Sequence, residues 1–174
     1  MLNKTIFLDR DGVINKDVNY LHRIKDCEFI DGIFEACIYF QKIGYTIIII
    51  TNQSGIARGY FNENDYQILT DWISLQFYEK SVELLDIFHC PHGPDSKCNC
   101  RKPEAGMLLE AQNKYSIDMT HSWLIGDKET DILAANNAGI TNTILLRNGH
   151  KDNKGISNAK HILNSINDCI KIIK

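Results

Sequence analysis

The chain has 174 residues, of which 24% are charged, and its formal net charge is −3 at pH 7. This length favours one domain spanning residues 1–174 with a sizeable core. The acidic balance argues against a nucleic-acid-binding surface, and no apolar run is long enough to span a bilayer. The chain begins with a strand-like run and shows no signal peptide, so we expect a cytoplasmic protein. Nothing marks an exposed apolar interface, so we expect a monomer.

The first predicted strand is residues 5–8, a short apolar run that leads into two carboxylates. Asp9 and Asp11 follow it directly, and Gly12 allows a tight turn. Two acids one residue apart point to opposite faces of a regular strand, so the chain must bend there. The bend predicts that both carboxylates converge on one bound group.

Helices and strands alternate through the rest of the sequence. In chain order they are a helix at 33–43, a strand at 45–50, a helix at 62–78, a strand at 84–89, a helix at 103–115, a strand at 122–125, a helix at 129–138, a strand at 143–146 and a helix at about 162–173. Their ends carry the expected signals: Asp31-Gly32 and Asn62 as N-caps, Pro103 in a first turn, and Gly44 and Gly139 after last turns.

This alternation predicts an α/β fold, a doubly wound parallel sheet with right-handed crossovers. Every polar motif follows one of the predicted strands, and the carboxyl ends of parallel strands meet at one edge of a sheet. The sequence therefore predicts that these motifs gather at a single site. The polar stretch at residues 147–160 is expected to be mobile.

The gathered side chains suit phosphoryl transfer. Asp9 is a candidate nucleophile and Asp11 a candidate general acid and base. Thr51 and Asn52 supply groups that hold oxygens, and Lys102 supplies a fixed cation. Any one of these residues is more often a turn or capping residue than a catalytic one. As an ordered set, each after its own strand, they favour catalysis.

A further carboxylate, Asp127, follows the fourth strand, and Asp131 lies one helical turn beyond it. A cluster of acids repels itself and needs a cation, and oxygen ligands suit Mg²⁺. Together with Lys102, Mg²⁺ would neutralise the charge of a phosphoryl group.

The loop at residues 90–101 predicts a zinc site. Cys90, His92, Cys98 and Cys100 provide three thiolates and one imidazole, the ligand set of a closed structural site. The loop has almost no apolar residues, so a metal would have to order it. One alternative is three reduced surface thiols that cluster by chance, which the histidine within the cluster disfavours. Another is a nucleic-acid-binding zinc knuckle, which the acidic net charge disfavours.

The zinc loop runs straight into Arg101 and Lys102, so the metal is expected to position two cations at the site. The remaining cysteines, Cys27, Cys37 and Cys169, are expected to be small hydrophobic residues in or near the core.

The ordered motifs resemble those of the haloacid-dehalogenase-like (HAD-like) phosphatase superfamily, over residues 5–146. The resemblance implies a Rossmann-like core in which Asp9 is the nucleophile and Asp11 the general acid and base. It also implies that Mg²⁺ binds the Asp9 side chain, the Asp11 backbone carbonyl and Asp127. Thr51 and Lys102 would stabilise the transferring phosphoryl group.

Within this superfamily the chain resembles the D-glycero-D-manno-heptose 1,7-bisphosphate 7-phosphatases. The matching segments are FLDRDG (7–12), TNQSGIARG (51–59), CPH (90–92), CNCRKP (98–103), GML (106–108) and GDK (126–128). The resemblance implies Mg²⁺-dependent removal of the 7-phosphate through an aspartyl-phosphate intermediate, in heptose synthesis for lipopolysaccharide or other surface glycans. It implies a substrate site of Asp17, Asn19, Tyr20, Thr51, Asn52, Gln53, Ser54, Arg101, Lys102 and Lys128.

A sugar bisphosphate carries a second phosphate that something other than Mg²⁺ must hold. Arg101 and Lys128 are the candidate cations, because a guanidinium donates two hydrogen bonds to a phosphate and both residues lie at the mouth of the predicted site. Arg58 is a weaker candidate, and Arg147 is a further candidate for a phosphate contact.

One feature of the sequence departs from many heptose phosphatases, and another from the larger members of the superfamily, which insert a cap domain. The spacer between His92 and Cys98 is short, a form that also occurs in the sister group of histidinol-phosphate phosphatases, which is the alternative function. No linker is long enough to hold a large cap domain. The anomer at C1 of a heptose substrate is not indicated by the sequence.

A non-catalytic, zinc-stapled binding module on the same scaffold is the alternative from another class. The joint presence of Asp9, Asp11, Lys102 and Asp127 argues against it, because a binding module has no need of a nucleophile and its cations.

Overall fold

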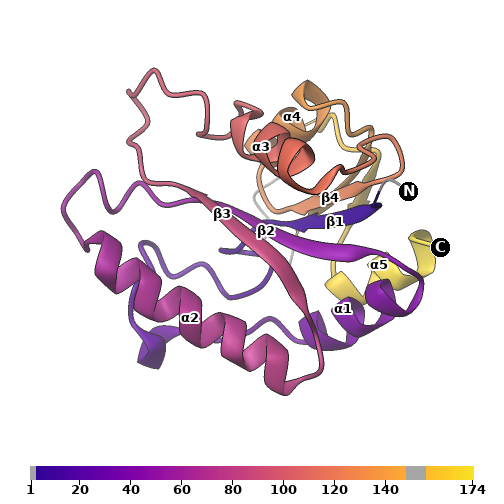
Figure 1. Cartoon of the computed structure of the whole chain (residues 1–174), viewed down its shortest axis with the longest axis horizontal. Helices are drawn as coiled ribbons and strands as arrows, with labels where there is room; N and C mark the ends of the chain where they lie inside the picture. Colours follow the sequence, from indigo (N-terminus) through magenta and orange to yellow (C-terminus); the bar gives the residue numbers. More distant parts are fainter. Residues whose placement is uncertain (1–2, 148–155) are drawn as a thin grey trace.

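The computed structural model describes residues 3–147 and 156–174. Within these residues six strands form one parallel sheet in the order β3-β2-β1-β4-β5-β6 (Figure 1). The strands are β1 (Thr5–Leu8), β2 (Thr46–Asn52), β3 (Leu84–Cys90), β4 (Trp123–Gly126), β5 (Asn142–Leu146) and β6 (His161–Leu163).

Helices cover both faces of the sheet. In Figure 1, α3 and α4 lie on one side and α1, α2 and α5 on the other, with bounds α1 (Ile33–Lys42), α2 (Glu63–Glu79), α3 (Gly106–Tyr115), α4 (Glu129–Asn137) and α5 (Ile166–Ile172). Alternate residues of the central strands enter different cores: Ile47 and Ile49 belong to one apolar cluster, and Ile48 and Ile50 to the other. This two-sided burial explains why β2 is an uninterrupted apolar run.

The order in which the chain adds strands to the sheet reverses beside β1. It adds β2 and β3 on one side of β1, then returns to place β4 on the other side. Ligands of open α/β sheets bind at the carboxyl ends of the strands next to such a reversal. The doubly wound α/β prediction is confirmed, and no large cap domain is present in the part of the chain that is described.

Local capping signals account for several helix ends. Asn62 and Asp65 form a reciprocal capping box at the start of α2, as the sequence predicts for Asn62. Of the pair Asp31-Gly32 predicted to cap α1, Gly32 is the N-cap, with φ 87°, and no side chain caps the helix. A Cβ at Gly32 would lie 2.2 Å from Asn167 Oδ1, so the close approach of α5 requires a glycine there.

The helix expected at 103–115 begins later, at Gly106. Residues before it form a turn in which Glu104 N donates to the Arg101 carbonyl at 2.8 Å. The amide of Gly106 donates to the Asn99 carbonyl at 2.9 Å. Contacts with the cysteine loop, which the local pattern does not contain, therefore delay the helix.

The C-terminal segment also differs from the single helix expected at about 162–173. Residues His161–Leu163 form β6 beside β5, and α5 starts only after Ser165, whose side chain accepts a hydrogen bond from Asn167 N. A sixth strand was not predicted, because three residues give no clear periodicity. Residues 148–155, part of the stretch expected to be mobile, lie outside the described residues.

Cys37 and Cys169 are fully buried in the core, and Cys27 packs partly buried against it, as expected. None of the helices that the structure describes has the length and apolar character needed to cross a bilayer.

Candidate active site

Asp9 lies at the end of β1, in the centre of the sheet. Its backbone N–H donates to the Ile125 carbonyl of β4 at 3.0 Å, which fixes the residue between two strand ends. Its side chain is buried, and Oδ1 accepts from the Arg10 backbone N–H at 2.7 Å and from Lys102 Nζ at 2.8 Å. Both of these contacts go to one carboxylate oxygen, and neither uses Oδ2.

Lys102 is a buried cation held by three oxygen atoms. Its Nζ lies 2.8 Å from Asp9 Oδ1, 2.6 Å from Asp131 Oδ1 and 3.2 Å from the Ile50 carbonyl. Burial alone lowers the pKa of a lysine, but the two carboxylates outweigh it and raise the pKa of Lys102. The side chain is therefore a permanently charged group beside Asp9.

Two further carboxylates complete an acidic cluster. Asp131 accepts from the backbone N–H groups of Asp127 and Lys128 at 3.2 and 3.0 Å, so its side chain closes the turn after β4. Carboxylate oxygens of Asp9, Asp127 and Asp131 all lie within 4.8 Å of one another. The sequence indicates Asp131 only as an additional carboxylate, whereas the structure places it in direct contact with Lys102.

The electrostatics of this cluster suit the binding of a cation. Burial and then the charge of Asp131 raise the pKa of Asp9, and burial raises the pKa of Asp127 to about 6. Asp127 Oδ1 is buried without a hydrogen-bond partner. The three carboxylates have one buried lysine, Lys102, and the charge of Lys128 acts on Asp127 from a partly exposed position. This excess of buried negative charge, all on oxygen ligands, fits Mg²⁺.

Two glycines permit the carboxylates to approach. A Cβ at Gly12, whose φ is +91°, would lie 2.2 Å from Asp127 Oδ2. A Cβ at Gly126 would lie 2.3 Å from the Asp131 Cβ. Asp127 and Asp131 can occupy these positions only because neither Gly12 nor Gly126 carries a side chain.

Asp11 is surrounded by donors. Arg10 reaches its two oxygens at 3.1 Å (Nε to Oδ1) and 2.9 Å (Nη2 to Oδ2), Asn15 Nδ2 donates at 2.9 Å and Gln53 Nε2 at 3.0 Å. Burial raises the pKa of a carboxyl group, but here Arg10 and the hydrogen bonds outweigh burial and hold the pKa of Asp11 below its ordinary value. Asp11 is therefore ionised in the ligand-free protein.

Sequence reasoning missed Arg10. Its side chain is only 2% exposed, although an arginine beside two acids in a loop is ordinarily solvated. The guanidinium also donates to the Leu21 carbonyl at 3.2 Å, so it ties the first loop together from within. No local signal in the sequence distinguishes such a buried arginine from an exposed one.

Thr51 and Asn52 are still part of β2, one of the strands next to Asp9. Thr51 is buried and accepts from Gln53 Nε2 at 2.8 Å. Asn52 pairs with the backbone of Lys102: its Nδ2 donates to the Lys102 carbonyl, and its Oδ1 accepts from the Lys102 N–H, both at 3.1 Å. The asparagine thus fixes the main chain from which the lysine reaches Asp9.

A cavity of about 340 Å³ opens above these groups. All of the predicted catalytic and substrate residues line it, together with Gly55, Thr130 and Asp131: Asp9, Asp11, Asp17, Asn19, Tyr20, Thr51, Asn52, Gln53, Ser54, Arg101, Lys102 and Lys128. The structure therefore gathers at one place residues that the sequence distributes over five segments.

The mouth of the cavity carries charged and strained residues. Lys128 Nζ lies 3.0 Å from Asp17 Oδ2. Asn19 and Tyr20 both have left-handed backbones, with φ of 54° and 55°, a strain that is often found at ligand sites. Arg101, another cation of the lining, donates to the His92 carbonyl at 3.2 Å.

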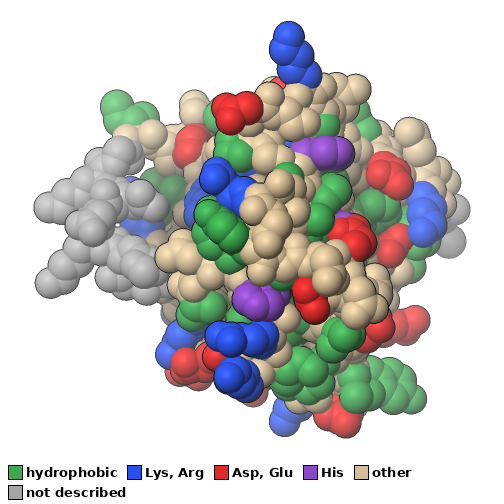
Figure 2. Space-filling model, turned by 90° about the vertical axis from the view of Figure 1, so that its left-hand side faces the viewer, with side chains coloured by type: hydrophobic (Ala, Val, Ile, Leu, Met, Phe, Trp, Pro, Cys, Tyr) green, Lys and Arg blue, Asp and Glu red, His purple; other side chains and the backbone are tan. Residues whose placement is uncertain are grey.

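Two candidate phosphate contacts are not part of this lining. Arg58 is exposed and Arg147 is half-buried, and neither is among the described residues that border the cavity. Figure 2 faces the side of the molecule where the strands end, and basic and acidic side chains are intermixed on it. This face does not present one continuous basic surface of the kind that binds nucleic acid.

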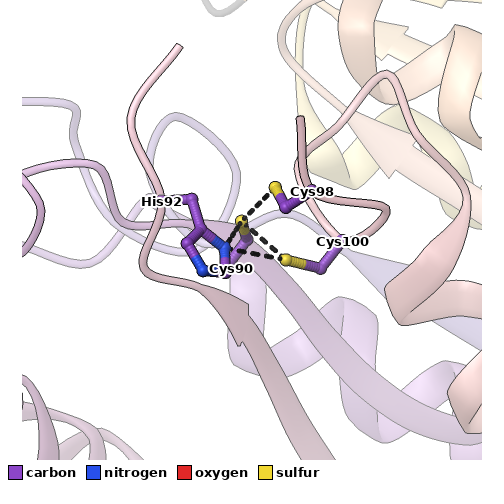
Figure 3. Close-up of side chains that lie close together, drawn as sticks. All are labelled: Cys90, His92, Cys98 and Cys100. Atoms are coloured by element: carbon purple, nitrogen blue, oxygen red, sulfur yellow. Dashed lines mark hydrogen bonds between the residues drawn. The ribbon is translucent and has the colours of Figure 1, made fainter. Parts of the chain in front are cut away.

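The four residues of the predicted zinc site converge (Figure 3). Cys90 Sγ lies 3.4 Å from His92 Nδ1 and 3.7 Å from Cys98 Sγ, and Cys100 Sγ lies 2.9 Å from Cys90 Sγ and 3.3 Å from His92 Nδ1. Tetrahedral zinc with bonds of about 2.0–2.3 Å places its ligands about 3.4–3.8 Å apart. Two of the four separations lie in that range, a third is 0.1 Å below it, and the Cys90–Cys100 pair is closer, so three thiols and an imidazole are placed about one centre as a closed zinc site requires.

The thiols of this cluster differ in acidity. Burial raises the pKa of Cys90 to about 12. For Cys98, burial acts in the same direction but is outweighed, first by the Arg101 backbone N–H, and its pKa falls to about 6. A thiolate is the metal-binding form, so Cys98 is ready to bind a cation near neutral pH.

The cysteine loop packs tightly against the start of α3. A Cβ at Gly106 would lie 2.2 Å from the Asn99 carbonyl oxygen, so only glycine lets the Cys98–Cys100 turn rest there. Two residues after Cys100 the chain reaches Lys102. The metal candidate and the buried lysine are therefore parts of one short, braced segment.

Comparison with known proteins places the chain among phosphatases. Residues 99–169 match the model of the HAD-hydrolase-like family. A D-glycero-alpha-D-manno-heptose-1,7-bisphosphate 7-phosphatase of Photorhabdus laumondii is 51% identical, and the match covers 90% of this chain and 89% of that protein. The D-glycero-beta-D-manno-heptose-1,7-bisphosphate 7-phosphatase of the same organism is 47% identical, with coverage of 97% and 94%.

A solved structure agrees with these relatives. The D,D-heptose 1,7-bisphosphate phosphatase of B. bronchiseptica, crystallised with magnesium and phosphate, has a TM-score of 0.87 and 30% identity, with 97% of each chain covered. The similarity thus extends over nearly the whole length in both sequence and structure. The chain belongs to the D-glycero-D-manno-heptose-1,7-bisphosphate 7-phosphatase family of HAD-like hydrolases.

Proposed function

We propose that the protein is a Mg²⁺-dependent phosphatase that removes the 7-phosphate of D-glycero-D-manno-heptose 1,7-bisphosphate. The observation that carries the proposal is the buried Asp9–Lys102–Asp131 cluster beside Asp127, whose Oδ1 has no hydrogen-bond partner. The relatives named above act on this substrate by name, which favours heptose bisphosphate over the alternative, histidinol phosphate.

Asp9 is the proposed nucleophile. Its Oδ1 is held by Lys102 and by the Arg10 backbone, which leaves Oδ2 as the oxygen that attacks phosphorus. Attack forms an aspartyl phosphate and releases the sugar alkoxide, and hydrolysis of that ester regenerates Asp9. Lys102 supports both steps because its charge stays next to the phosphoryl oxygens without reorganisation.

Mg²⁺ is proposed to bind through the Asp9 side chain, the Asp11 backbone carbonyl and Asp127. When bound, it neutralises charge on the phosphoryl group. Asp127 suits this role because its buried Oδ1 is not satisfied within the described protein. Asp131, by contrast, uses its oxygens for Lys102 and for two backbone N–H groups, so it braces the site.

Asp11 is the proposed general acid and base. In the second step it takes a proton from the attacking water, for which the ionised state held by Arg10 is the correct one. In the first step it must give a proton to the leaving oxygen. A phosphate dianion in the cavity raises the pKa of the nearby carboxyl group and so opposes the effect of Arg10.

The second phosphate of the substrate is proposed to bind at the mouth of the cavity. Arg101 and Lys128 line the cavity, and their side chains bond to the His92 carbonyl and to Asp17 and not to the Asp9 cluster. Lys128 Nζ donates to Asp17 Oδ2 at 3.0 Å, so its ammonium group is fixed beside another residue of the cavity lining. The segment from Asp17 to Tyr20 and the side chain of Ser54 supply the rest of the proposed contacts.

The cluster of Cys90, His92, Cys98 and Cys100 is proposed to hold one structural zinc ion. The four donors leave no open position for catalysis. We also propose that residues 1–174 act as one domain, as a monomer in the cytoplasm. The described cysteines form no disulfide, which suits a reducing compartment.

A phosphate-release assay with purified protein and Mg²⁺ tests the proposed function. The substrates are both anomers of heptose 1,7-bisphosphate, other sugar phosphates and histidinol phosphate. We expect release from the 7-position of the bisphosphate, lost on chelation of Mg²⁺ and in Asp9→Asn, with Asp71→Asn on the exposed face of α2 as the control variant. A kcat/KM for histidinol phosphate about tenfold above that for heptose bisphosphate would replace the proposal with the alternative.

A further inference from the structure

The side chain of Gln53 has no donor left for a substrate. From the sequence it is a predicted substrate ligand, but in the structure it is only 3% exposed. Its Nε2 carries two hydrogens, and both are used: one for Asp11 Oδ2 at 3.0 Å and one for Thr51 Oγ1 at 2.8 Å. The remaining Oε1 is an acceptor, which repels a phosphate oxygen.

The neighbours determine which way round this amide lies. Asp11 is ion-paired with Arg10 at 2.9 Å, so its carboxylate accepts hydrogen bonds and cannot donate one. An Oε1 placed against it would set two acceptors face to face. The Gln53 backbone N–H also donates to the Cys90 carbonyl at 2.7 Å, which anchors the residue to the end of β3.

The direction of the Gln53 bond has a consequence for Thr51. Because the hydroxyl oxygen accepts from Gln53, the proton of the hydroxyl must point away from that amide. Thr51 lines the same cavity as Asp9, where the phosphoryl group enters in the proposed reaction. A hydroxyl held in this way is ready to donate to a phosphoryl oxygen, and such preorganised donors lower the barrier to phosphoryl transfer.

We propose that Gln53 is a positioning residue and not a substrate ligand. Its single amide group holds the Thr51 hydroxyl as a donor toward the phosphoryl group and holds the Asp11 carboxylate at the wall of the cavity. The inference rests on the phosphoryl transfer proposed above. It adds that one residue links Thr51, which binds the phosphoryl oxygen, to Asp11, which moves the proton.

Two substitutions separate positioning from binding. Gln53→Met keeps the length of the side chain and removes both hydrogen bonds. Gln53→Glu keeps the shape of the side chain, but its carboxylate repels Asp11 and accepts a hydrogen bond from the Thr51 hydroxyl, so the Thr51 proton no longer points toward the substrate. We expect kcat for heptose bisphosphate to fall about 10-fold in Gln53→Met and about 100-fold in Gln53→Glu, with KM within about twofold. A raised KM with unchanged kcat would show a substrate ligand and overturn the inference.

Gln67 provides a matched control. Its Nε2 donates to Asp71 Oδ1 at 2.7 Å on the exposed surface of α2, a glutamine–aspartate bond outside the active-site cavity. Gln67→Met and Gln67→Glu are expected to keep wild-type kcat and KM. The melting temperature of all four variants is measured as well. If Gln53→Met unfolds below the assay temperature, the kinetics of Gln53→Glu alone decide the test.

A double-mutant cycle with Thr51→Val tests whether Gln53 acts through the hydroxyl. We expect the effect of Gln53→Met on kcat to be at least about threefold smaller in the Thr51→Val background. Equal effects in both backgrounds would contradict the proposal.

Orthovanadate with Mg²⁺, followed by calorimetry, gives a readout that does not depend on the sugar. We expect its affinity to fall in both Gln53 variants and to stay unchanged in the Gln67 variants. If the wild-type protein neither binds vanadate nor releases phosphate, the proposed function fails and the inference with it. If the wild-type protein is active and the Gln53 variants match it, only the inference on Gln53 fails.

Discussion

At the scale of single residues, the candidate site depends on its glycines as much as on its charged side chains. The acids that face each other after β1 and β4 approach because Gly12 leaves room for Asp127. Gly12 also has φ +91°, a conformation that an L-residue adopts at a cost of about 1–2 kcal/mol. The glycine is therefore required twice, for the turn and for the space.

Gly12→Ala tests this requirement. The new Cβ would lie 2.2 Å from Asp127 Oδ2, so the carboxylate must move away from the proposed Mg²⁺ position. We expect kcat/KM to fall by about 100-fold or more, and Mg²⁺ binding measured by calorimetry to weaken with it.

Gly59→Ala is the control for this substitution. Gly59 has φ +72°, but a Cβ there meets nothing within 4 Å. It carries the same kind of backbone strain without the collision, so activity should stay within about twofold. Equal losses of activity in the two variants would attribute the effect to strain alone.

At the scale of elements, two braces hold the segment that leads into α3. One is the contact of the cysteine loop with Gly106, and the other is the pairing of Asn52 with the backbone of Lys102. Between them the loop has little apolar surface of its own. Its order is therefore expected to depend on a metal.

Cys100→Ser tests that dependence. We expect loss of the one bound zinc measured by elemental analysis, a melting temperature lower by about 5 °C, and a reduced kcat, since the lysine follows two residues later. Cys27→Ser, a half-buried cysteine outside the cluster, should keep zinc and activity. Full activity in zinc-free Cys100→Ser protein would contradict a role for the metal in positioning Lys102.

Asp86 joins β3 to α3 and gives a prediction about pH. Its Oδ2 accepts from Lys114 Nζ and from the Tyr115 hydroxyl, both at 2.8 Å, and its Oδ1 accepts from Ile87 N at 2.8 Å. Burial raises the pKa of this carboxyl group, but these donors outweigh burial and lower it from its ordinary 3.8. Because folding lowers the pKa, the contribution to stability is full above pH 3.8 and is lost as the pH falls through the lower folded value.

Asp86→Asn should therefore lower the free energy of unfolding at pH 7, measured by urea titration. The difference from the wild type should shrink as the pH falls below about 4. Glu110→Gln, an exposed position on α3, is the control and should show no such difference. A difference that stays constant down to pH 2 would show that the ionised carboxylate is not what stabilises this contact.

At the scale of the whole molecule, the C-terminal segment completes a core that begins with α1. Ile166, Cys169 and Ile173 are fully buried in the same cluster as α1, and β6 extends the sheet beside β5. Burial of an isoleucine contributes about 1.5–3 kcal/mol, and the whole fold is stable by about 5–15 kcal/mol. The C-terminal segment therefore contributes a large part of the free energy of unfolding.

A chain ending at residue 147 is expected to lose cooperative unfolding, measured by thermal circular dichroism, and with it the phosphatase activity. Removal of the exposed Lys174 alone should change neither. A truncated chain that still melts cooperatively near the wild-type temperature would show that α5 and β6 are dispensable for the fold.

The sequence predicted the architecture well because the relevant signals are local. Apolar runs mark the first five strands, and capping residues such as Asn62 mark helix starts. The order of the motifs along the chain was enough to predict that they share one edge of the sheet, and every predicted catalytic and substrate residue lines one cavity. Errors arose where a contact outside the element sets its boundary, with the cysteine loop at Gly106 and with β5 at β6.

What the sequence by itself determined, then, is which chemical groups stand at the ends of which strands. Only the tertiary structure decided what each group touches. It turned Gln53 toward Asp11, which lies 42 residues away in the chain, and Asn52 toward Lys102, which lies 50 residues away. The physical reason is that periodicity reports which side of an element is buried, whereas hydrogen-bond partners depend on where distant segments meet in space.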